Sequence, residues 1–448
     1  MKNFTSGLFL LLVCFSCAVT PESKTTFAVE ETDVLHGSVK QVTDVIVHDI
    51  FSPPVAARIY AYMSIAAYET AIQGDQTYRS LAGQLNGFEL VPVPDPGLEH
   101  DFELASIHAL LKVGKALVFS EEKIEVFYDS IIKQYRQSGI SEETFDRSIA
   151  YGTKVADHVL AWAAKDNYKQ TRSFPKYTIE NNAATWKPTP PAYMDAVEPH
   201  WNKIRTFGID SAGQFKPVPP TPFSSEKKSQ FFKEALEVYQ MTKDLTPEQK
   251  EIASFWDCNP FMLNVKGHVM FATKKISPGG HWMNITNVAC KKAKADFRKA
   301  SEAYMRVSVA LVDGFISCWD EKYRSRLIRP ESFINQYVDQ DWVPLLQTPP
   351  FPEYTSGHSV ISSASAVTLT KLFGENFAFT DSTEIEFGLT ARSFNSFEQA
   401  AEEAAMSRMY GGIHYRPAVV NGMTEGRALG SYLMEKIKTR KEESLANN

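Results

Sequence analysis

The stretch Val55-Ala-Ala-Arg-Ile-Tyr-Ala-Tyr-Met-Ser-Ile-Ala-Ala-Tyr-Glu-Thr-Ala71 is a clear guide to the fold of this chain. Apolar side chains recur in it at intervals of three and four residues, which places them on one face of an α-helix. The same spacing recurs along most of the chain, whereas the alternation typical of strands is scarce. We therefore predict an all-α fold. Besides 55–71, the expected helices are 101–118, 122–137, 141–164, 229–241, 247–255, 287–319, 356–373, 397–409 and 419–437.

A proline-rich segment, residues 187–223, divides these helices into two groups. It holds eight of the 24 prolines and few periodic apolar positions, so we expect a long extended crossover. The flanking parts, residues 27–186 and 224–440, are each long enough for a four-helix bundle. Two sequences that fit capping boxes, Thr246-Pro-Glu-Gln249 and Ser396-Phe-Glu-Gln399, mark helix starts in the second part.

The composition is that of an ordinary soluble protein. The chain has 448 residues, of which 44 % are hydrophobic and 22 % charged, so it can bury one large core or two. The net charge of −6 and the lack of a basic tract outside the segments below argue against a nucleic-acid binder.

The N-terminal residues 1–17 are typical of a signal peptide. Lys2 precedes a short apolar run, residues 8–13, that is too short to span a membrane. Ser16-Cys17 before a polar stretch resembles a bacterial lipoprotein processing site, although Cys14 stands where Leu is usual. We expect export, either to the periplasm or outer membrane of a Gram-negative bacterium or by simple secretion. Any membrane attachment would be a lipid on Cys17.

Beyond residue 17 the chain has three cysteines, Cys258, Cys290 and Cys318. Because three is odd, at least one thiol is unpaired within a single chain. We expect buried free thiols, and the sequence indicates no disulfide framework.

Three short segments near the C-terminal end carry the candidate chemistry. They are Lys322-Tyr-Arg-Ser-Arg-Leu-Ile-Arg329-Pro330, Thr355-Ser-Gly-His358 and Ser407-Arg-Met-Tyr-Gly-Gly-Ile-His414. The first has four basic residues in eight positions within an acidic chain, the local concentration that an anion pocket requires. The lysine, two arginines, serine hydroxyl, glycine N–H and two histidines of these segments suit phosphate or its mimic vanadate.

Each segment has a local reason to converge on one anion. On one helix, Lys322 and Arg329 would lie within ~20° of each other, and Pro330 would end that helix. The planar fork of an arginine and the compact charge of a lysine can then grip different oxygens. Gly357 permits close backbone approach at a helix N-terminus, which favours anions. The Gly411-Gly412 pair interrupts its helix and lets His414 point back toward the anion that Arg408 holds.

The order and spacing of these residues resemble those of vanadium-dependent haloperoxidases and type-2 phosphatidic acid phosphatases, two branches of one superfamily. The shared pattern is Lys-x6-Arg-Pro, then Ser-Gly-His, then Ser-Arg-x5-His. One position departs, because Thr355 stands where many members have proline. Trp319 and Phe351 occupy the offsets at which the fungal vanadium chloroperoxidase has Trp and Phe beside its halide site. The chain therefore looks most like the peroxidase branch, and in particular like bacterial iodoperoxidase-like members.

The resemblance implies two packed helical bundles, with the oxyanion site in the C-terminal four-helix bundle, and a vanadate cofactor. His414 would be the metal ligand, and His358 would act in acid–base catalysis. Lys322 would polarise the bound peroxide as well as bind the oxyanion. The remaining implied contacts are Arg329, Ser356, the Gly357 N–H and Arg408 for the oxyanion, and Trp319 and Phe351 for the halide pocket.

The implied function is oxidation of a halide by hydrogen peroxide to hypohalous acid, which can halogenate a small organic acceptor. Iodide is the expected halide, because it needs the least oxidising power and the least desolvation. One alternative is a periplasmic acid phosphatase in which His414 forms a phosphohistidine and His358 protonates the leaving oxygen. Another is a non-catalytic oxyanion-binding surface lipoprotein.

Three further residues have weaker signals. Asp257 follows Phe255-Trp256 and could orient His358, although a helix cap or a surface acid is the plainer interpretation. His268 and His281 have no carboxylate or cysteine at a metal-ligand spacing, so we expect them to be structural.

Overall fold

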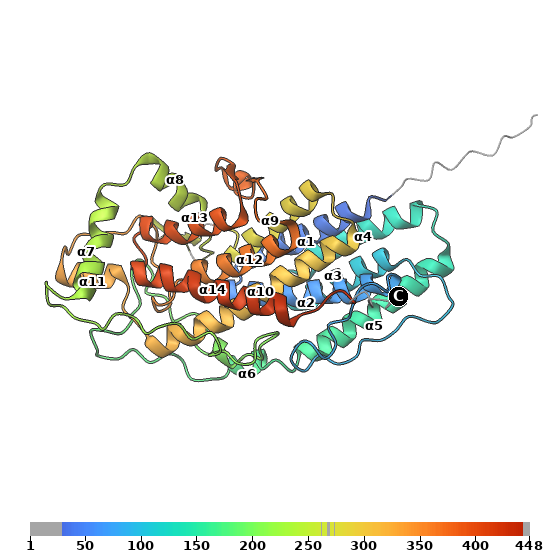
Figure 1. Cartoon of the computed structure of the whole chain (residues 1–448), viewed down its shortest axis with the longest axis horizontal. Coiled ribbons are helices and arrows are strands. Elements are labelled where there is room, and N and C mark those ends of the chain that lie inside the picture. The colour runs from blue at the N-terminus through green and yellow to red at the C-terminus, as the bar shows by residue number, and fades with distance from the viewer. Residues whose placement is uncertain (1–28, 261, 267–268, 273, 442–448) are drawn as a thin grey trace, which may run out of the picture.

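The computed structural model describes residues 29–260, 262–266, 269–272 and 274–441 (Figure 1). The expected signal peptide, Cys17 and His268 lie outside these residues. The first half of the chain forms α1 (Glu31–His48), α2 (Pro53–Ala71), α3 (Phe102–Leu117), α4 (Glu121–Gln137), α5 (Glu142–Ala163) and α6 (Tyr168–Thr171). The second half forms α7 (Gln230–Lys243), α8 (Pro247–Phe255), α9 (Pro278–Ala293), α10 (Phe297–Ser325), α11 (Pro330–Tyr337), α12 (Gly357–Phe373), α13 (Phe397–Tyr410) and α14 (Arg416–Lys436).

The prediction of an all-α fold is confirmed. Strands in the described residues form only two antiparallel hairpins, β1 (Leu263–Lys266) with β2 (Val269–Ala272) and β3 (Phe379–Asp381) with β4 (Arg392–Phe394). The 3-10 turns are η1 (Ile72–Gly74), η2 (Trp201–Lys203) and η3 (Ile385–Phe387). None of the helices in these residues is both long and apolar enough to cross a membrane.

Most expected helices appear within two or three residues of their predicted ends, but one prediction is wrong. The single helix expected over 287–319 is two helices, α9 and α10, because Lys294 adopts a left-handed conformation (φ 51°) and Asp296 caps the start of α10. Of the two expected capping boxes, the one at Thr246 is complete. At Ser396 the hydroxyl caps the helix, but the Gln399 side chain accepts from the Asn395 N–H instead.

Helix α10 joins the two halves of the chain. It packs against α2 from the first half and against α12 from the second (Figure 1). One continuous set of buried apolar side chains runs through all three helices, so the halves share a core. The domain boundaries at 187 and 223 stay a prediction. Between α6 and α7 the described backbone has no regular element except η2.

Helix α12, which begins within the second predicted segment, and α14, which follows the third, pack at backbone distance. Gly422, Gly426 and Gly430 form a small-residue stripe on α14 that faces the backbone of α12. A Cβ on Gly426 would lie 2.1 Å from the Val360 carbonyl oxygen, a distance that no side chain can occupy. The stripe therefore fixes how closely the start of α12 approaches α14.

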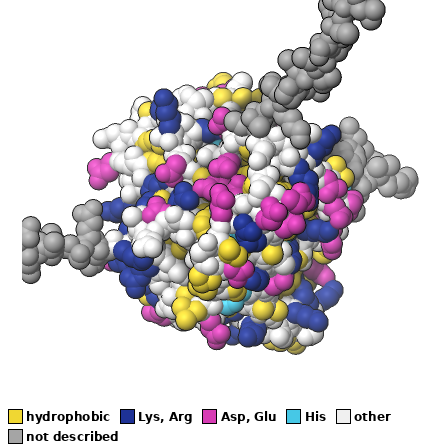
Figure 2. Space-filling model, turned by 90° about the vertical axis from the view of Figure 1, so that its right-hand side faces the viewer, with side chains coloured by type: hydrophobic (Ala, Val, Ile, Leu, Met, Phe, Trp, Pro, Cys, Tyr) yellow, Lys and Arg dark blue, Asp and Glu magenta, His cyan; other side chains and the backbone are white. Residues whose placement is uncertain are grey.

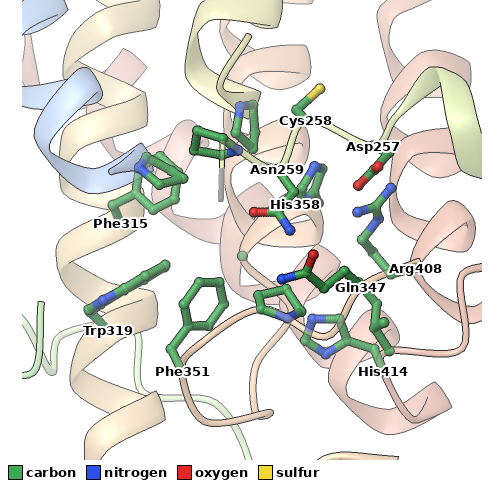
Figure 3. A pocket seen from close by; sticks show the side chains of 16 residues that line it. Asp257, Cys258, Asn259, Phe315, Trp319, Gln347, Phe351, His358, Arg408 and His414 are labelled. Carbon is green, nitrogen blue, oxygen red and sulfur yellow. The ribbon is translucent and has the colours of Figure 1, made fainter. Parts of the chain in front are cut away.

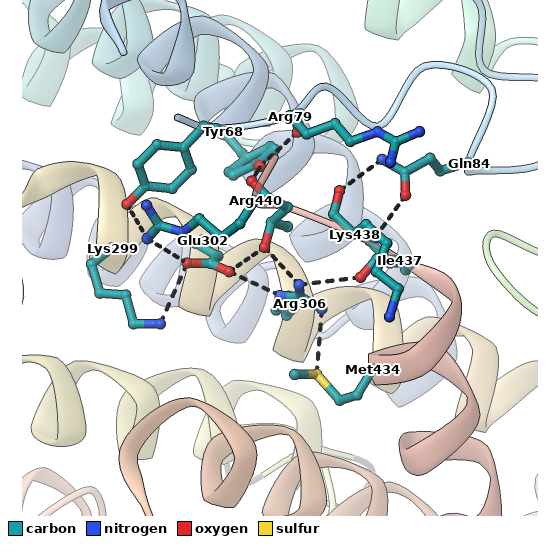
Figure 4. A network of polar contacts seen from close by, with 12 residues as sticks. Tyr68, Arg79, Gln84, Lys299, Glu302, Arg306, Met434, Ile437, Lys438 and Arg440 are labelled. Atoms are coloured by element: carbon teal, nitrogen blue, oxygen red, sulfur yellow. Dashed lines mark hydrogen bonds and ion pairs between the residues drawn. The ribbon is translucent and has the colours of Figure 1, made fainter. Parts of the chain in front are cut away.

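A buried polar network holds the C-terminal segment against α10 (Figure 4). The Glu302 carboxylate accepts from Arg306 (3.1 Å) and Arg440 (3.2 Å), and Arg306 also donates to the Thr439 hydroxyl (2.6 Å). On the first half, the Tyr68 hydroxyl donates to the Arg79 carbonyl (2.8 Å). The Tyr68 hydroxyl also lies 3.3 Å from the Thr439 carbonyl oxygen, and this contact ties the two halves together. On the face shown in Figure 2, Lys and Arg side chains are interspersed with Asp and Glu.

Candidate oxyanion and halide site

The three predicted segments meet at a small cavity in the second half of the chain (Figure 3). Its volume is about 40 Å³, room for an ion and a few waters but not for a bulky organic phosphate. Six of the predicted residues line it: Trp319, Phe351, Gly357, His358, Arg408 and His414. Lys322 and Arg329 lie beside the ring of one lining residue, Phe351, and Ser356 directly precedes another, Gly357.

His414 lies in the turn between α13 and α14, where Gly412 takes a positive φ of 75°. Its Nδ1 is 2.8 Å from Oε1 of Glu353, and its Nε2 is 3.1 Å from Nη1 of Arg329. Because the carboxylate accepts a hydrogen bond from the Nδ1–H, the proton of the neutral ring stays on Nδ1 and Nε2 keeps its lone pair. Burial, with Arg329 adding to it, lowers the pKa of His414 well below its ordinary value. His414 is therefore a neutral imidazole whose orientation a carboxylate fixes, the state of a metal ligand.

The two arginines are held by backbone carbonyls. Arg329 donates from Nε to Phe351 (2.9 Å) and from Nη1 to Ile413 (2.8 Å). Its Nη2 is buried and has no partner among the described residues. Arg408 donates from Nη2 to the Trp256 carbonyl (2.6 Å). Burial lowers the pKa of Arg329 to about 10, which leaves it charged at neutral pH. A buried charged N–H without an acceptor is what an oxyanion would satisfy.

Lys322 and Arg329 do not share one helix, contrary to the prediction from the sequence. Helix α10 ends at Ser325, with Arg326 left-handed (φ 51°), and Pro330 begins α11 instead of ending a helix. Lys322 and Arg329 are thus not on one helix, but both cations lie near the Phe351 ring, at 5.2 and 5.1 Å from its centroid. Burial lowers the pKa of Lys322 to about 8.

The ammonium group of Lys322 is fully engaged with the backbone. It donates to the carbonyls of Pro352 (3.1 Å), Glu353 (3.0 Å) and Thr355. Because an ammonium has three donors, an oxyanion would have to replace one of these carbonyls to contact it.

His358 is the second residue of α12. Its ring donates to the Trp256 carbonyl, and its Nε2 is buried without a partner among the described residues. Burial, with Arg408 adding to it, lowers the pKa of His358 well below its ordinary value. Asp257, for which orienting His358 was the less favoured interpretation, pairs its carboxylate with Lys275 (2.5 Å).

The start of α12 shapes the floor of the cavity. The Ser356 hydroxyl caps α12 by accepting from the Ser359 N–H (3.3 Å). A Cβ on Gly357 would lie 3.5 Å from the Trp319 ring, in ordinary contact, so glycine leaves this corner open. The Gly357 backbone belongs to a helix N-terminus, where free N–H groups favour an anion.

Two aromatic rings form the opposite wall. The Trp319 and Phe351 centroids are 4.9 Å apart, and both rings line the cavity. The Trp319 indole N–H donates to the Val197 carbonyl (3.2 Å), which also accepts from the Tyr323 hydroxyl (2.6 Å). The crossover thus braces this wall from behind. The cavity combines a cationic side and an apolar side, which suits an oxyanion beside a weakly hydrated halide.

Comparison with solved structures gives the family. The crystal structure of the first bacterial vanadium-dependent iodoperoxidase matches with 51 % identity, a TM-score of 0.86, and coverage of 92 % of this chain and 97 % of that one. The chain belongs to the vanadium-dependent haloperoxidases. Residues 302–443 also match the VCPO second helical-bundle domain.

More distant haloperoxidases share the fold. The holo and apo forms of a bacterial vanadium-dependent chloroperoxidase match with 15 % identity each and TM-scores of 0.67 and 0.66. They cover 87 % and 86 % of this chain, and 93 % and 94 % of theirs. No curated protein matches the chain.

The haloperoxidase site contains two groups that the sequence did not reveal. Glu353 lies two residues before the second predicted segment, and a single carboxylate there has no spacing that marks it as the partner of a histidine. The Trp256 carbonyl, which holds both His358 and Arg408, is a backbone atom and carries no sequence signal. Both groups orient the residues that the sequence did identify.

Proposed function

We propose that this chain is an iodide peroxidase that uses vanadate to oxidise iodide with hydrogen peroxide. The observation that carries the proposal is the neutral His414 imidazole, fixed by Glu353, beside Nη2 of Arg329, which has no partner among the described residues. The site residues fit vanadate because they supply one neutral nitrogen ligand and several buried cationic donors. The 51 % identity to a bacterial iodoperoxidase supports the choice of substrate.

His414 would hold vanadate through Nε2, and Arg329, Arg408 and the Gly357 N–H would neutralise its oxygens. Ser356 and Lys322 would contact vanadate after giving up one of the hydrogen bonds that they make in this structure. When bound, vanadate would supply Lewis-acid activation of hydrogen peroxide. His358 would accept a proton at Nε2 when peroxide enters and return it to the departing water. Its donor bond to the Trp256 carbonyl keeps that nitrogen aimed at the cavity.

The shape of the cavity favours small inorganic reactants. A volume of about 40 Å³ and two aromatic walls suit peroxide and a halide, whereas a phosphate monoester with an organic group would meet Trp319 and Phe351. Iodide is the most weakly hydrated of the halides that such an enzyme meets, so it loses the least hydration free energy when it moves from water to a site beside an apolar wall.

The test is triiodide formation by the purified mature protein with hydrogen peroxide, before and after addition of orthovanadate. Hydrolysis of p-nitrophenyl phosphate is measured alongside it. We expect vanadate-dependent triiodide from the wild type and none from His414→Ala at saturating vanadate. Ester hydrolysis that vanadate inhibits, without triiodide, would instead make the protein a phosphatase. Full activity of His414→Ala would refute the ligand assignment.

We also propose export, with cleavage before Cys17 and a lipid on that cysteine. The support is the sequence of residues 1–17 and the polar stretch that follows. Wild type and Cys17→Ser are compared by membrane fractionation of the host cells and by mass spectrometry of the N-terminal peptide. Equal partitioning of both to the soluble exported fraction would leave simple secretion.

A further inference from the structure

Three ligand atoms from distant parts of the chain converge beside the haloperoxidase cavity. They are Sγ of Cys258, Nδ1 of His281 and Oε1 of Glu384, from the α8–α9 connection, α9 and the residue before η3. The sulfur lies 3.4 Å from Nδ1, Nδ1 lies 3.2 Å from Oε1, and the sulfur lies 3.9 Å from Oε1. All three residues are buried.

Two of these separations, 3.4 and 3.2 Å, are close to the edges of a tetrahedral zinc site, and the third, 3.9 Å, is about 0.3 Å longer. Zinc–ligand bonds of about 2.0 Å to nitrogen and oxygen and about 2.3 Å to sulfur give edges of roughly 3.3–3.6 Å. A protein-only account is less complete, because a single ring nitrogen, Nδ1, faces both a thiol and a carboxylate oxygen. Without an ion, the Nδ1–H bonds to the Glu384 oxygen (3.2 Å), and the thiol is left with a 3.9 Å contact to the same oxygen, which is too long for a strong hydrogen bond.

The other nitrogen of the ring is arranged as in metal sites. Nε2 of His281 is 2.7 Å from Oδ2 of Asp381, and both side chains are fully buried. The second carboxylate oxygen of Asp381 is fixed by the N–H (2.9 Å) and hydroxyl (2.6 Å) of Thr383. A carboxylate that takes the far N–H of an imidazole sets its tautomer and directs the near lone pair at a metal.

We propose that Cys258, His281 and Glu384 bind a zinc ion, with Asp381 orienting His281 and a water in the fourth position. The mixed sulfur, nitrogen and oxygen set favours zinc over magnesium or calcium, which prefer oxygen alone. Binding exchanges two protons, one from the thiol and one from the imidazolium, for the ion. Cys258 is also one of the residues that line the cavity in Figure 3, although its sulfur points away from His358 and His414.

The proposed site is coupled to the haloperoxidase site through one short segment. Trp256, two residues before Cys258, provides the carbonyl that holds His358 and Arg408. Its indole also stacks on the His281 ring, with centroids 4.6 Å apart. A zinc ion would therefore anchor the backbone that positions these two residues. Zinc binding itself does not depend on the proposed peroxidase activity.

The test is the zinc content of the full mature protein, measured by inductively coupled plasma mass spectrometry after incubation with zinc chloride and desalting. We expect about one zinc per chain in the wild type. Cys258→Ser and Glu384→Gln, which preserve shape, should lower zinc affinity by at least about tenfold. The matched control is Cys290→Ser, a buried free thiol outside the cluster, which should keep the wild-type content.

Cobalt provides a readout that is independent of stoichiometry. The cobalt-loaded wild type should show a thiolate-to-cobalt charge-transfer band that is absent from Cys258→Ser and present in Cys290→Ser. Circular dichroism establishes that each variant is folded. A wild type that retains no zinc, or a Cys258→Ser protein that binds zinc as tightly as the wild type, would overturn the proposal and leave a buried ion pair between His281 and its two carboxylates.

Discussion

Replacing Glu353 with glutamine tests the central element of the site, the carboxylate behind His414. Glu353 Oε1 accepts from Nδ1 of His414 (2.8 Å) and from the Tyr415 N–H (2.9 Å). Glutamine retains an acceptor oxygen and nearly the same volume, so the ring should keep its orientation. What it removes is the negative charge behind the imidazole, and with it part of the basicity of Nε2.

The expected loss follows from the type of hydrogen bond. A bond to a charged group contributes about 1.5–3 kcal/mol, and a neutral bond about 0.5–1.5 kcal/mol. The difference, on the order of 1–1.5 kcal/mol, corresponds to vanadate affinity that is about 5–10 times weaker. Glu353→Ala also leaves the His414 and Tyr415 donors without an acceptor, so its loss should reach about 10–100-fold.

Vanadate affinity is measured by isothermal titration calorimetry on the vanadate-free protein. The matched control is Glu69→Gln in α2. Glu69 is also buried, accepts one backbone N–H (Leu81, 2.6 Å) and one side chain (Ser80, 2.8 Å), and has a pKa raised by burial to about 7, as Glu353 has. Glu69→Gln should bind vanadate like the wild type. Affinity of Glu353→Gln within twofold of the wild type would refute the orienting role of the carboxylate.

Three other changes have defined outcomes. His358→Ala should lower kcat for iodide by at least about 100-fold at saturating vanadate, since it removes the proton acceptor, and a smaller effect would exclude that role. Gly426→Ala should destabilise the fold by about 1–3 kcal/mol or more in urea unfolding, because its methyl group meets the Val360 carbonyl, whereas Gly37→Ala, with its nearest contact at 3.7 Å, should be neutral or stabilising. Burial raises the pKa of Glu425 to about 7, so its contribution to stability is complete below pH 4.5 and is lost as the pH rises through 7. Between about pH 5 and 8, the unfolding free energy of Glu425→Gln should therefore fall less than that of the wild type, by on the order of 3 kcal/mol. An unchanged pH profile would contradict the raised pKa of Glu425.

The helices could be predicted because their periodicity is local. Packing of the α12–α14 pair could not, since it depends on glycines that become meaningful only when the facing carbonyls are known. Helix α1 was not predicted, although its apolar face is regular. The break at Lys294 was also missed, because a left-handed residue other than glycine has no strong sequence signal.

The candidate site was predictable in its residues but not in their partners. The spacing of the three segments identified the basic side chains among the described residues that line the cavity, His358, Arg408 and His414. It placed Lys322 and Arg329 on one helix. In the structure the helix ends before Arg326, the chain turns there, and Arg329 still lies close to Lys322. His281 looked structural because its partners are 23, 100 and 103 positions away, at Cys258, Asp381 and Glu384, beyond any local metal-ligand spacing.

The bonding of Lys322 changes how mutations in this site should be interpreted. Its three donors hold the carbonyls of the 352–355 loop, while Arg329 holds the Phe351 carbonyl next to it. That loop carries the halide wall at one end and Glu353, the partner of His414, in its middle. Loss of the Lys322 charge would therefore free the loop as well as remove a contact to the oxyanion. A defect of a Lys322 variant in both vanadate affinity and iodide KM would be the mark of loop release, because the loss of one oxyanion contact alone would change vanadate affinity and leave the halide wall in place.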